Sequence, residues 1–306
     1  MINWKKLGLI FNPYEYLSRN EKLLTHASNP LAVKIESNIY RIFYSSRDAN
    51  NRSSVGGFDF DIDKLKVIHN FELPFFCYGN SESYYSAGVS IGSYYENSNG
   101  KFILFMAWQN PEGQHWRGDI GRLRINQNYE FTLDNQSPYM TIDKKFDKVS
   151  LSYPWVSKDS SGNYEMFYGS TITWKEENGE MIHVINKAES SDGEIWLRTG
   201  MALPYKLNYY QAFSRPTHQY VSNDFQRMWF SYRSGTGQKY RIGYAEKDNR
   251  EWSILNDKSG IDVSPSGWDS EMIEYPFVFN HNGRNFMLYN GNGFGKSGIG
   301  LAVENF

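Results

Sequence analysis

One pattern recurs along the chain and limits the possible folds more than any other feature. A proline or small residue opens a short apolar run, a polar turn follows, and an aromatic-rich segment comes next. The copies begin at Asn29-Pro30, Ala87-Gly88, Tyr153-Pro154, Arg215-Pro216 and Tyr275-Pro276. In the second half of the chain, successive prolines of this pattern lie 62 and 60 residues apart. A unit of this length built only of strands predicts an all-β fold, a five-bladed β-propeller that spans 1–306 as one domain.

The ends of the chain predict how the ring closes. Each copy carries a further strand, and Asp192-Gly193 and Asn282-Gly283 are strong hairpin-turn signals, so each blade is an antiparallel meander. The last copy ends at Phe306 without an outer strand, while the apolar segment 6–11 belongs to no copy. We therefore expect the N-terminal strand to close the last blade, because this pairing removes two exposed sheet edges.

Composition and charge exclude several classes of function. The formal net charge of −2 argues against binding to nucleic acid. No apolar run is long enough for a membrane span, and the N-terminus does not resemble a signal peptide, so we expect a cytoplasmic protein. The 23 Tyr, 20 Phe and 9 Trp exceed what pleated strands require and leave rings on which sugars can stack. The single cysteine, Cys77, cannot form an internal disulfide.

Polar and aromatic residues precede each apolar run. In a propeller the innermost strands start at one end of the central channel, so these residues converge on one mouth. We interpret the set as a substrate-binding funnel, although well-solvated strand starts are the alternative. Its members are His26, Asn29, Tyr84, Tyr85, Tyr153, Gln211, Arg215 and Tyr275.

Several phrases resemble a known group of proteins. They are Tyr44-Ser-Ser-Arg47-Asp48-Ala-Asn-Asn-Arg52-Ser, Met228-Trp-Phe-Ser-Tyr-Arg233-Ser, Tyr240-Arg-Ile-Gly-Tyr-Ala-Glu246, Gly267-Trp-Asp269-Ser-Glu271-Met and Tyr289-Asn-Gly-Asn292-Gly-Phe-Gly. Together with the repeat they resemble the five-bladed propeller glycosidases of the arabinanase/xylosidase, invertase-like and mannoside-phosphorylase families. The resemblance is closer to glycosidase-like proteins encoded in bacterial surface-polysaccharide gene clusters. It implies a protein that acts on glycosidic bonds, and it adds Arg47, Arg52 and Asn292 to the substrate-binding candidates.

The chain departs from the acidic triad that this resemblance implies. The family's first inner strand begins Asp-Pro, whereas this chain has Asn29-Pro30, and an amide cannot act as a general base or nucleophile. Gln211 stands where a catalytic glutamate is expected on the fourth strand. Only Glu274-Tyr-Pro276 resembles the family's Glu-x-Pro acid.

Four carboxyl groups remain as catalytic candidates. They are Glu274, Asp269, Glu271 and Asp48, with Glu274 preferred as the principal acid/base group. For Asp48 the alternative is a structural ion pair at the rim. Arg215 would place a cation in the funnel that suits an acidic sugar or a diphosphate, and it could also pair with Glu274.

No cofactor or metal is expected, because the six histidines show no metal-ligand spacing. The leading interpretation is a glycoside hydrolase-like protein in surface-polysaccharide metabolism that takes a sugar or oligosaccharide. The alternatives are a glycosyltransferase or phosphorylase with an anionic donor such as a nucleotide sugar, or an inactive sugar-binding propeller.

Overall fold

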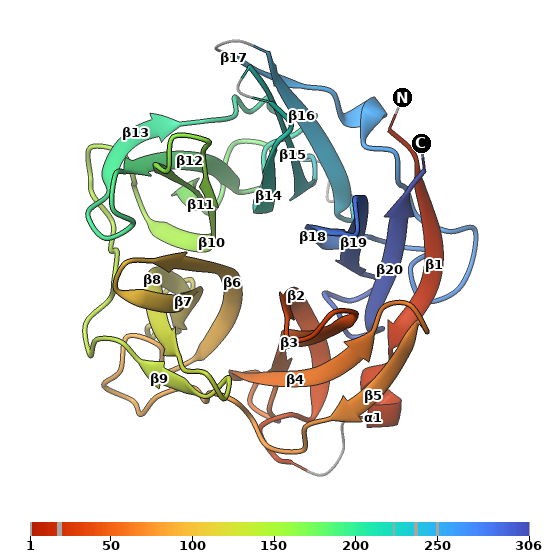
Figure 1. Ribbon diagram of the computed structural model, residues 1–306. Helices are drawn as coiled ribbons and strands as arrows, with labels where there is room; N and C mark the ends of the chain where they lie inside the picture. The colour runs from red at the N-terminus through yellow and green to blue at the C-terminus, as the bar shows by residue number, and fades with distance from the viewer. Residues whose placement is uncertain (1, 17–19, 223, 236–237, 249–250, 306) are drawn as a thin grey trace.

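Antiparallel strand meanders surround a central axis in the computed structural model (Figure 1). The structure describes residues 2–16, 20–222, 224–235, 238–248 and 251–305. Helical structure in these ranges is limited to α1 (Pro13–Tyr16) and the 3₁₀ turn Asn256–Lys258. No helix in these same ranges has the length and apolar character needed to cross a membrane.

Three sheets are separate four-stranded units. In the order of their hydrogen-bonded neighbours they contain β10 (Ser150–Lys158), β11 (Tyr164–Thr173), β12 (Ile182–Ser190) and β13 (Leu197–Met201); β14 (Ser214–Tyr220), β15 (Phe225–Tyr232), β16 (Arg241–Asp248) and β17 (Glu251–Ile254); and β1 (Trp4–Phe11), β20 (Ile299–Glu304), β19 (Arg284–Asn290) and β18 (Glu274–His281). The N-terminal strand β1 thus pairs with the C-terminal strand β20, as the sequence predicts.

The remaining strands form one eight-stranded sheet. It contains β2 (Thr25–Lys34), β3 (Ile39–Arg47), β4 (Ser53–Asp61), β5 (Lys66–Asn70), β6 (Gly88–Asn97), β7 (Gly100–Gln109), β8 (Arg117–Ile125) and β9 (Phe131–Leu133). Two antiparallel meanders, β2–β5 and β6–β9, make up this sheet. A single parallel pair, Ser53 with Gly88, joins them.

The innermost strands β2, β6, β10, β14 and β18 line the axis (Figure 1). Each contacts the next, and β18 contacts β2. Apolar side chains of neighbouring meanders fill the space between them, for example Phe43, Phe105 and Leu288 in one buried cluster. The core therefore lies between the meanders, and the polar residues of the inner strands are left facing the axis.

A β-bulge interrupts every innermost strand at the same place. The register shifts fall between Ser28 and Leu31, Ile91 and Tyr94, Ser152 and Trp155, Ser214 and Thr217, and Glu274 and Phe277. Four of the bulges contain a residue with left-handed φ directly before proline, namely Asn29 (55°), Tyr153 (42°), Arg215 (49°) and Tyr275 (53°). Since a bulge changes the direction of a side chain, these residues are aimed differently from the rest of their strand.

The bulges correct the expected register of the second copy. The sequence pattern assigns Tyr84 and Tyr85 to the start of an inner strand, but β6 begins at Gly88 and its bulge lies at Gly92 and Ser93. Serine stands where the other copies have proline, and glycine stands where they have a large polar residue. A Cβ atom on Gly92 would lie 2.6 Å from the Leu104 carbonyl oxygen, so a larger side chain does not fit there.

Candidate functional site

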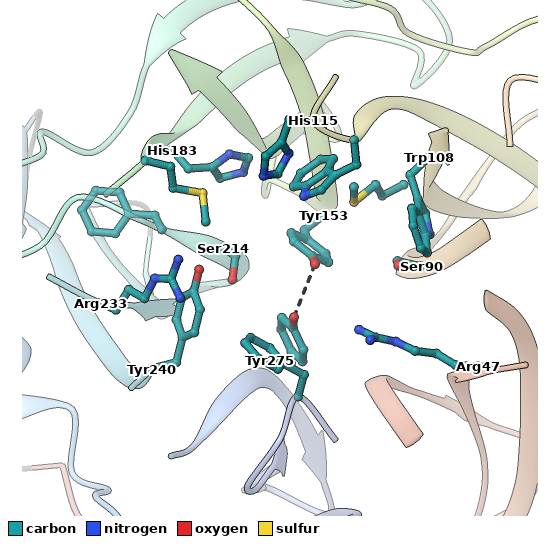
Figure 2. A pocket seen from close by; sticks show the side chains of 15 residues that line it. Arg47, Ser90, Trp108, His115, Tyr153, His183, Ser214, Arg233, Tyr240 and Tyr275 are labelled. Carbon is teal, nitrogen blue, oxygen red and sulfur yellow. Dashed lines mark hydrogen bonds between the residues drawn. The ribbon is translucent and has the colours of Figure 1, made fainter. Parts of the chain in front are cut away.

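A cavity of about 450 Å³ opens at one end of the axis. Its described lining is aromatic for the most part, with Trp108, Trp116, Tyr153, Phe213, Tyr240, Tyr275 and Phe294. Tyr153 and Tyr275, both at bulges, point toward each other with their hydroxyl oxygens 3.4 Å apart (Figure 2). The volume and the few polar groups among aromatic walls are typical of a small-molecule site.

Two arginines enter this cavity from opposite sides. Arg47 ends β3, and Arg233 follows β15 (Figure 2). Arg233 forms an ion pair with Glu180 at 2.7 Å and lies over the Tyr240 ring. No Asp or Glu is among the described residues that line the cavity.

Glu274 is a buried carboxyl group directly before Tyr275. Its side chain is fully buried, and in the described part of the chain neither carboxyl oxygen has a hydrogen-bond partner. Burial raises the pKa of Glu274 well above its ordinary value, and the charges of Arg47 and Arg233 oppose this rise only in part. The group is therefore a protonated acid near neutral pH, next to the cavity.

Arg215 lies at the centre of the ring and does not face the cavity. Its guanidinium donates to the backbone carbonyl oxygens of Ile91 and Pro30, the second at 2.7 Å. Burial lowers the pKa of Arg215 to about 9, while the Tyr153 and Tyr275 hydroxyls favour its charged form. Among the described ion pairs there is none between Arg215 and Glu274. Arg215 thus connects three inner strands.

Three of the four carboxyl candidates have structural surroundings. Asp48 accepts hydrogen bonds from the backbone of its own loop and pairs with Arg52 at 2.8 Å. These bonds outweigh the effect of burial and keep the pKa of Asp48 below its ordinary value. Asp269 pairs with Lys6 at 2.7 Å and accepts a hydrogen bond from Tyr289. Glu271 is exposed.

Several substrate-binding candidates also hold loops in place. The amide of Gln211 is buried and bonds to Asn178, to the backbone N–H of Asn208 and to the carbonyl oxygen of Met181. The Asn292 side chain accepts from two backbone N–H groups, those of Glu271 and Met272. Neither residue lines the described cavity, and Arg52, Tyr84 and Tyr85 do not line it either.

Asn29 and His26 lie on the Arg47 side of the site. Asn29 shares a small recess of about 30 Å³ with Arg47, and its side-chain oxygen has no hydrogen-bond partner among described residues. His26 has left-handed φ, and its Nδ1 lies 2.9 Å from the Thr25 hydroxyl oxygen. Burial, with the charges of Arg47 and Lys296, lowers the pKa of His26 to about 4. Of the sequence candidates, Arg47, Tyr153 and Tyr275 line the main cavity.

The sequence analysis did not select most of the lining. Trp108 ends an inner-to-middle hairpin, His115 and Trp116 precede β8, and Arg233 and Tyr240 flank a loop. His183 is buried, with its two ring nitrogens 2.6 Å from the Ser152 hydroxyl and 2.7 Å from the Thr171 hydroxyl. Burial lowers the pKa of His183 to about 4, so the ring is neutral. Within the described ranges no three His, Cys, Asp or Glu side chains are grouped to hold a metal ion.

Comparison of the sequence with known proteins identifies relatives over the whole chain. The uncharacterized protein Rv1502 of Mycobacterium tuberculosis is 38% identical over 305 residues, which cover 98% of each chain. The chain belongs to the same family as Rv1502. The uncharacterized protein MT1551, from another strain of that organism, matches the Rv1502 family member described here to the same extent. No protein-family model matches the sequence.

Solved structures similar to this member of the Rv1502 family are glycoside hydrolases and related enzymes. A protein described as a glycoside hydrolase aligns with a TM-score of 0.74 and 13% identity, over 99% of this chain and 92% of that chain. An endo-arabinase from Bacteroides thetaiotaomicron aligns with a TM-score of 0.64 and 13% identity, over 92% and 94%. A protein described with the GH130 family of mannoside phosphorylases aligns with a TM-score of 0.69 and 11% identity, over 99% and 93%. The chain therefore has the fold of the propeller glycosidases, which confirms the resemblance found in the sequence.

Proposed function

We propose that this chain is a five-bladed propeller, closed by its N-terminal strand, that acts on a glycosidic bond in the aromatic cavity with Glu274 as general acid. The observation that carries the proposal is the buried, unpaired carboxyl of Glu274 beside the cavity, between Arg47 and Arg233. The five identical bulges support the blade count, since each marks one innermost strand.

The chemistry asks for a group that holds a proton at neutral pH and releases it to a leaving oxygen. Because burial raises the pKa of Glu274, the carboxyl is suited to donate rather than to accept a proton. Since neither oxygen is exposed, contact with a bound sugar requires side chains at the base of the cavity to move. This movement is part of the proposal.

The second reactant is less constrained by the site. Glycosidases of the common types use two carboxyl groups on opposite sides of the sugar. Here the described lining has none, and Asp48 and Asp269 are held in ion pairs. One acid is sufficient for phosphorolysis or transfer, where the second reactant comes from solution.

Sugar binding without catalysis is the second candidate. The amides Asn29 and Gln211 at positions where the glycosidase resemblance implies acids favour it. A role in bacterial surface-polysaccharide metabolism and a cytoplasmic location remain proposals that rest on the sequence.

The test is turnover of a panel of aryl glycosides and oligosaccharides, with and without phosphate. Glu274→Gln keeps the shape of the side chain and removes the proton, so turnover should fall at least about a hundredfold. Circular dichroism should be unchanged. Glu271→Gln, three residues earlier and exposed, is the matched control and should keep wild-type turnover.

Wild-type turnover in Glu274→Gln would contradict the assignment of the acid. Binding of sugars without turnover in the unmodified protein would instead favour the binding-only candidate.

A further inference from the structure

Arg47 is a cation for which the described part of the chain supplies no acidic partner. Arg233, the other arginine of the cavity, pairs with Glu180. Asp48 follows Arg47 in sequence, but its carboxylate pairs with Arg52. No ion pair of Arg47 occurs among the described residues, although its side chain is partly buried.

The neighbouring titratable groups do not offset this charge. Glu274 is protonated near neutral pH because burial raises its pKa, and His183 is neutral because burial lowers its pKa to about 4. Lys296 lies close enough to His26 to lower the pKa of that histidine together with Arg47. The Arg47 side of the site is therefore positive and holds no described anion.

Arg47 also lines the small recess that extends from the cavity. The recess has a volume of about 30 Å³, enough for one or two atoms the size of a water oxygen. Its lining is polar beside Trp108, Tyr153 and Tyr275, with Ser28, Asn29 and Ser90 among its members. Hydroxyl groups and a guanidinium offer donors to an oxygen anion, and the recess is better matched to a flat carboxylate than to a bulkier phosphoryl group.

We propose that the sugar bound by this cavity carries a carboxylate, as a uronic acid does, and that this group enters the recess and binds Arg47. The inference rests on the proposed function of the cavity as a sugar site. It goes further by naming the substrate class and the residue that selects it. Burial of the pair away from solvent makes the charge-assisted hydrogen bond stronger than at an open surface.

The experiment measures binding by isothermal titration calorimetry, without need of turnover. Methyl glucuronide and methyl galacturonide are compared with methyl glucoside and methyl galactoside, and with glucose 6-phosphate and inorganic phosphate. We expect the unmodified protein to bind a uronide at least about tenfold more tightly than its neutral partner, with affinity that falls as sodium chloride increases.

Variants of Arg47 test the contact itself. Arg47→Gln should lose at least about tenfold of the uronide affinity and leave binding of the neutral sugar unchanged. Arg47→Lys keeps the charge but loses the two-pronged geometry, so its affinity should lie between the two. Arg284→Gln, an equal change in net charge at the far end of the β18–β19 hairpin, is the control and should bind as the unmodified protein does.

The outcomes separate this inference from the proposed function. Equal affinity for uronides and neutral sugars, unaffected by Arg47→Gln, would overturn the inference and leave the proposed function intact. Arg47-dependent binding of inorganic phosphate or glucose 6-phosphate, without uronide binding, would also overturn it, because the anion would then be a phosphoryl group. Binding of no sugar at all would overturn both.

Discussion

The pH dependence of thermal stability in Glu274→Gln tests the buried acid without knowledge of a substrate. Burial, opposed in part by Arg47 and Arg233, raises the pKa of Glu274 well above its ordinary 4.5. Above pH 4.5 the unfolded chain releases this proton while the folded protein keeps it. The unfolded state then binds fewer protons, so wild-type stability falls as pH rises from 4.5 toward the raised pKa. Glutamine does not titrate, and the variant lacks this loss.

The size of the effect follows from linkage. The stability difference between variant and wild type should grow by up to about 1.4 kcal/mol per pH unit in this window. Between pH 5 and pH 7 the variant should therefore gain at most about 2.7 kcal/mol, or roughly 5 °C in Tm for a domain of this size. Differential scanning calorimetry of both proteins at pH 5, 6, 7 and 8 measures it.

The comparison has an internal control. Glu271→Gln removes an exposed carboxyl from the segment just before β18, and its Tm should follow the wild-type curve at every pH. Parallel curves for wild type and Glu274→Gln across this range would refute the argument, because they would mean that Glu274 titrates alike in the folded and unfolded states.

Two further predictions concern other buried groups. Arg215→Ala should lower the free energy of unfolding by about 2–6 kcal/mol in urea titrations, because two buried carbonyl oxygens lose their donor; a loss no larger than that of Arg284→Ala would contradict this. His183→Gln should reduce the acid sensitivity of Tm: the folded pKa of His183 is lowered by burial to about 4, so the wild type loses up to about 3 kcal/mol as pH falls from 6.5 to 4, and an unchanged Tm profile would argue against a neutral buried ring.

The sequence predicted the fold through its prolines. The run that follows each proline becomes an innermost strand, and the residue before it takes left-handed φ at a bulge, which is why Tyr153 and Tyr275 were found as site residues. In the second copy Ser93 replaces the proline, and the expected strand start was wrong there. A pattern that depends on one residue type fails where that residue is absent.

The rest of the site could not be predicted because its contacts join distant parts of the chain. Arg215 bonds to Ile91 and Pro30, which are 124 and 185 residues away in sequence. Its spacing from proline is the same as that of Tyr153 and Tyr275, yet its longer side chain reaches carbonyl groups across the axis. Trp108 and Arg233 come from strand ends and loops, where the repeat imposes no pattern.

The five bulges explain why one carboxyl differs so strongly from the others. The first residue of each bulge is Ser28, Ile91, Ser152, Ser214 or Glu274, so four copies place a small or apolar side chain where the fifth places a carboxyl group. Because repeated positions share the same burial, the fold provides Glu274 with no partner designed for a charge, and desolvation then keeps its proton. A single departure from the repeat at Glu274, next to two arginines from other strands, is thus sufficient to give a structural ring a reactive acid.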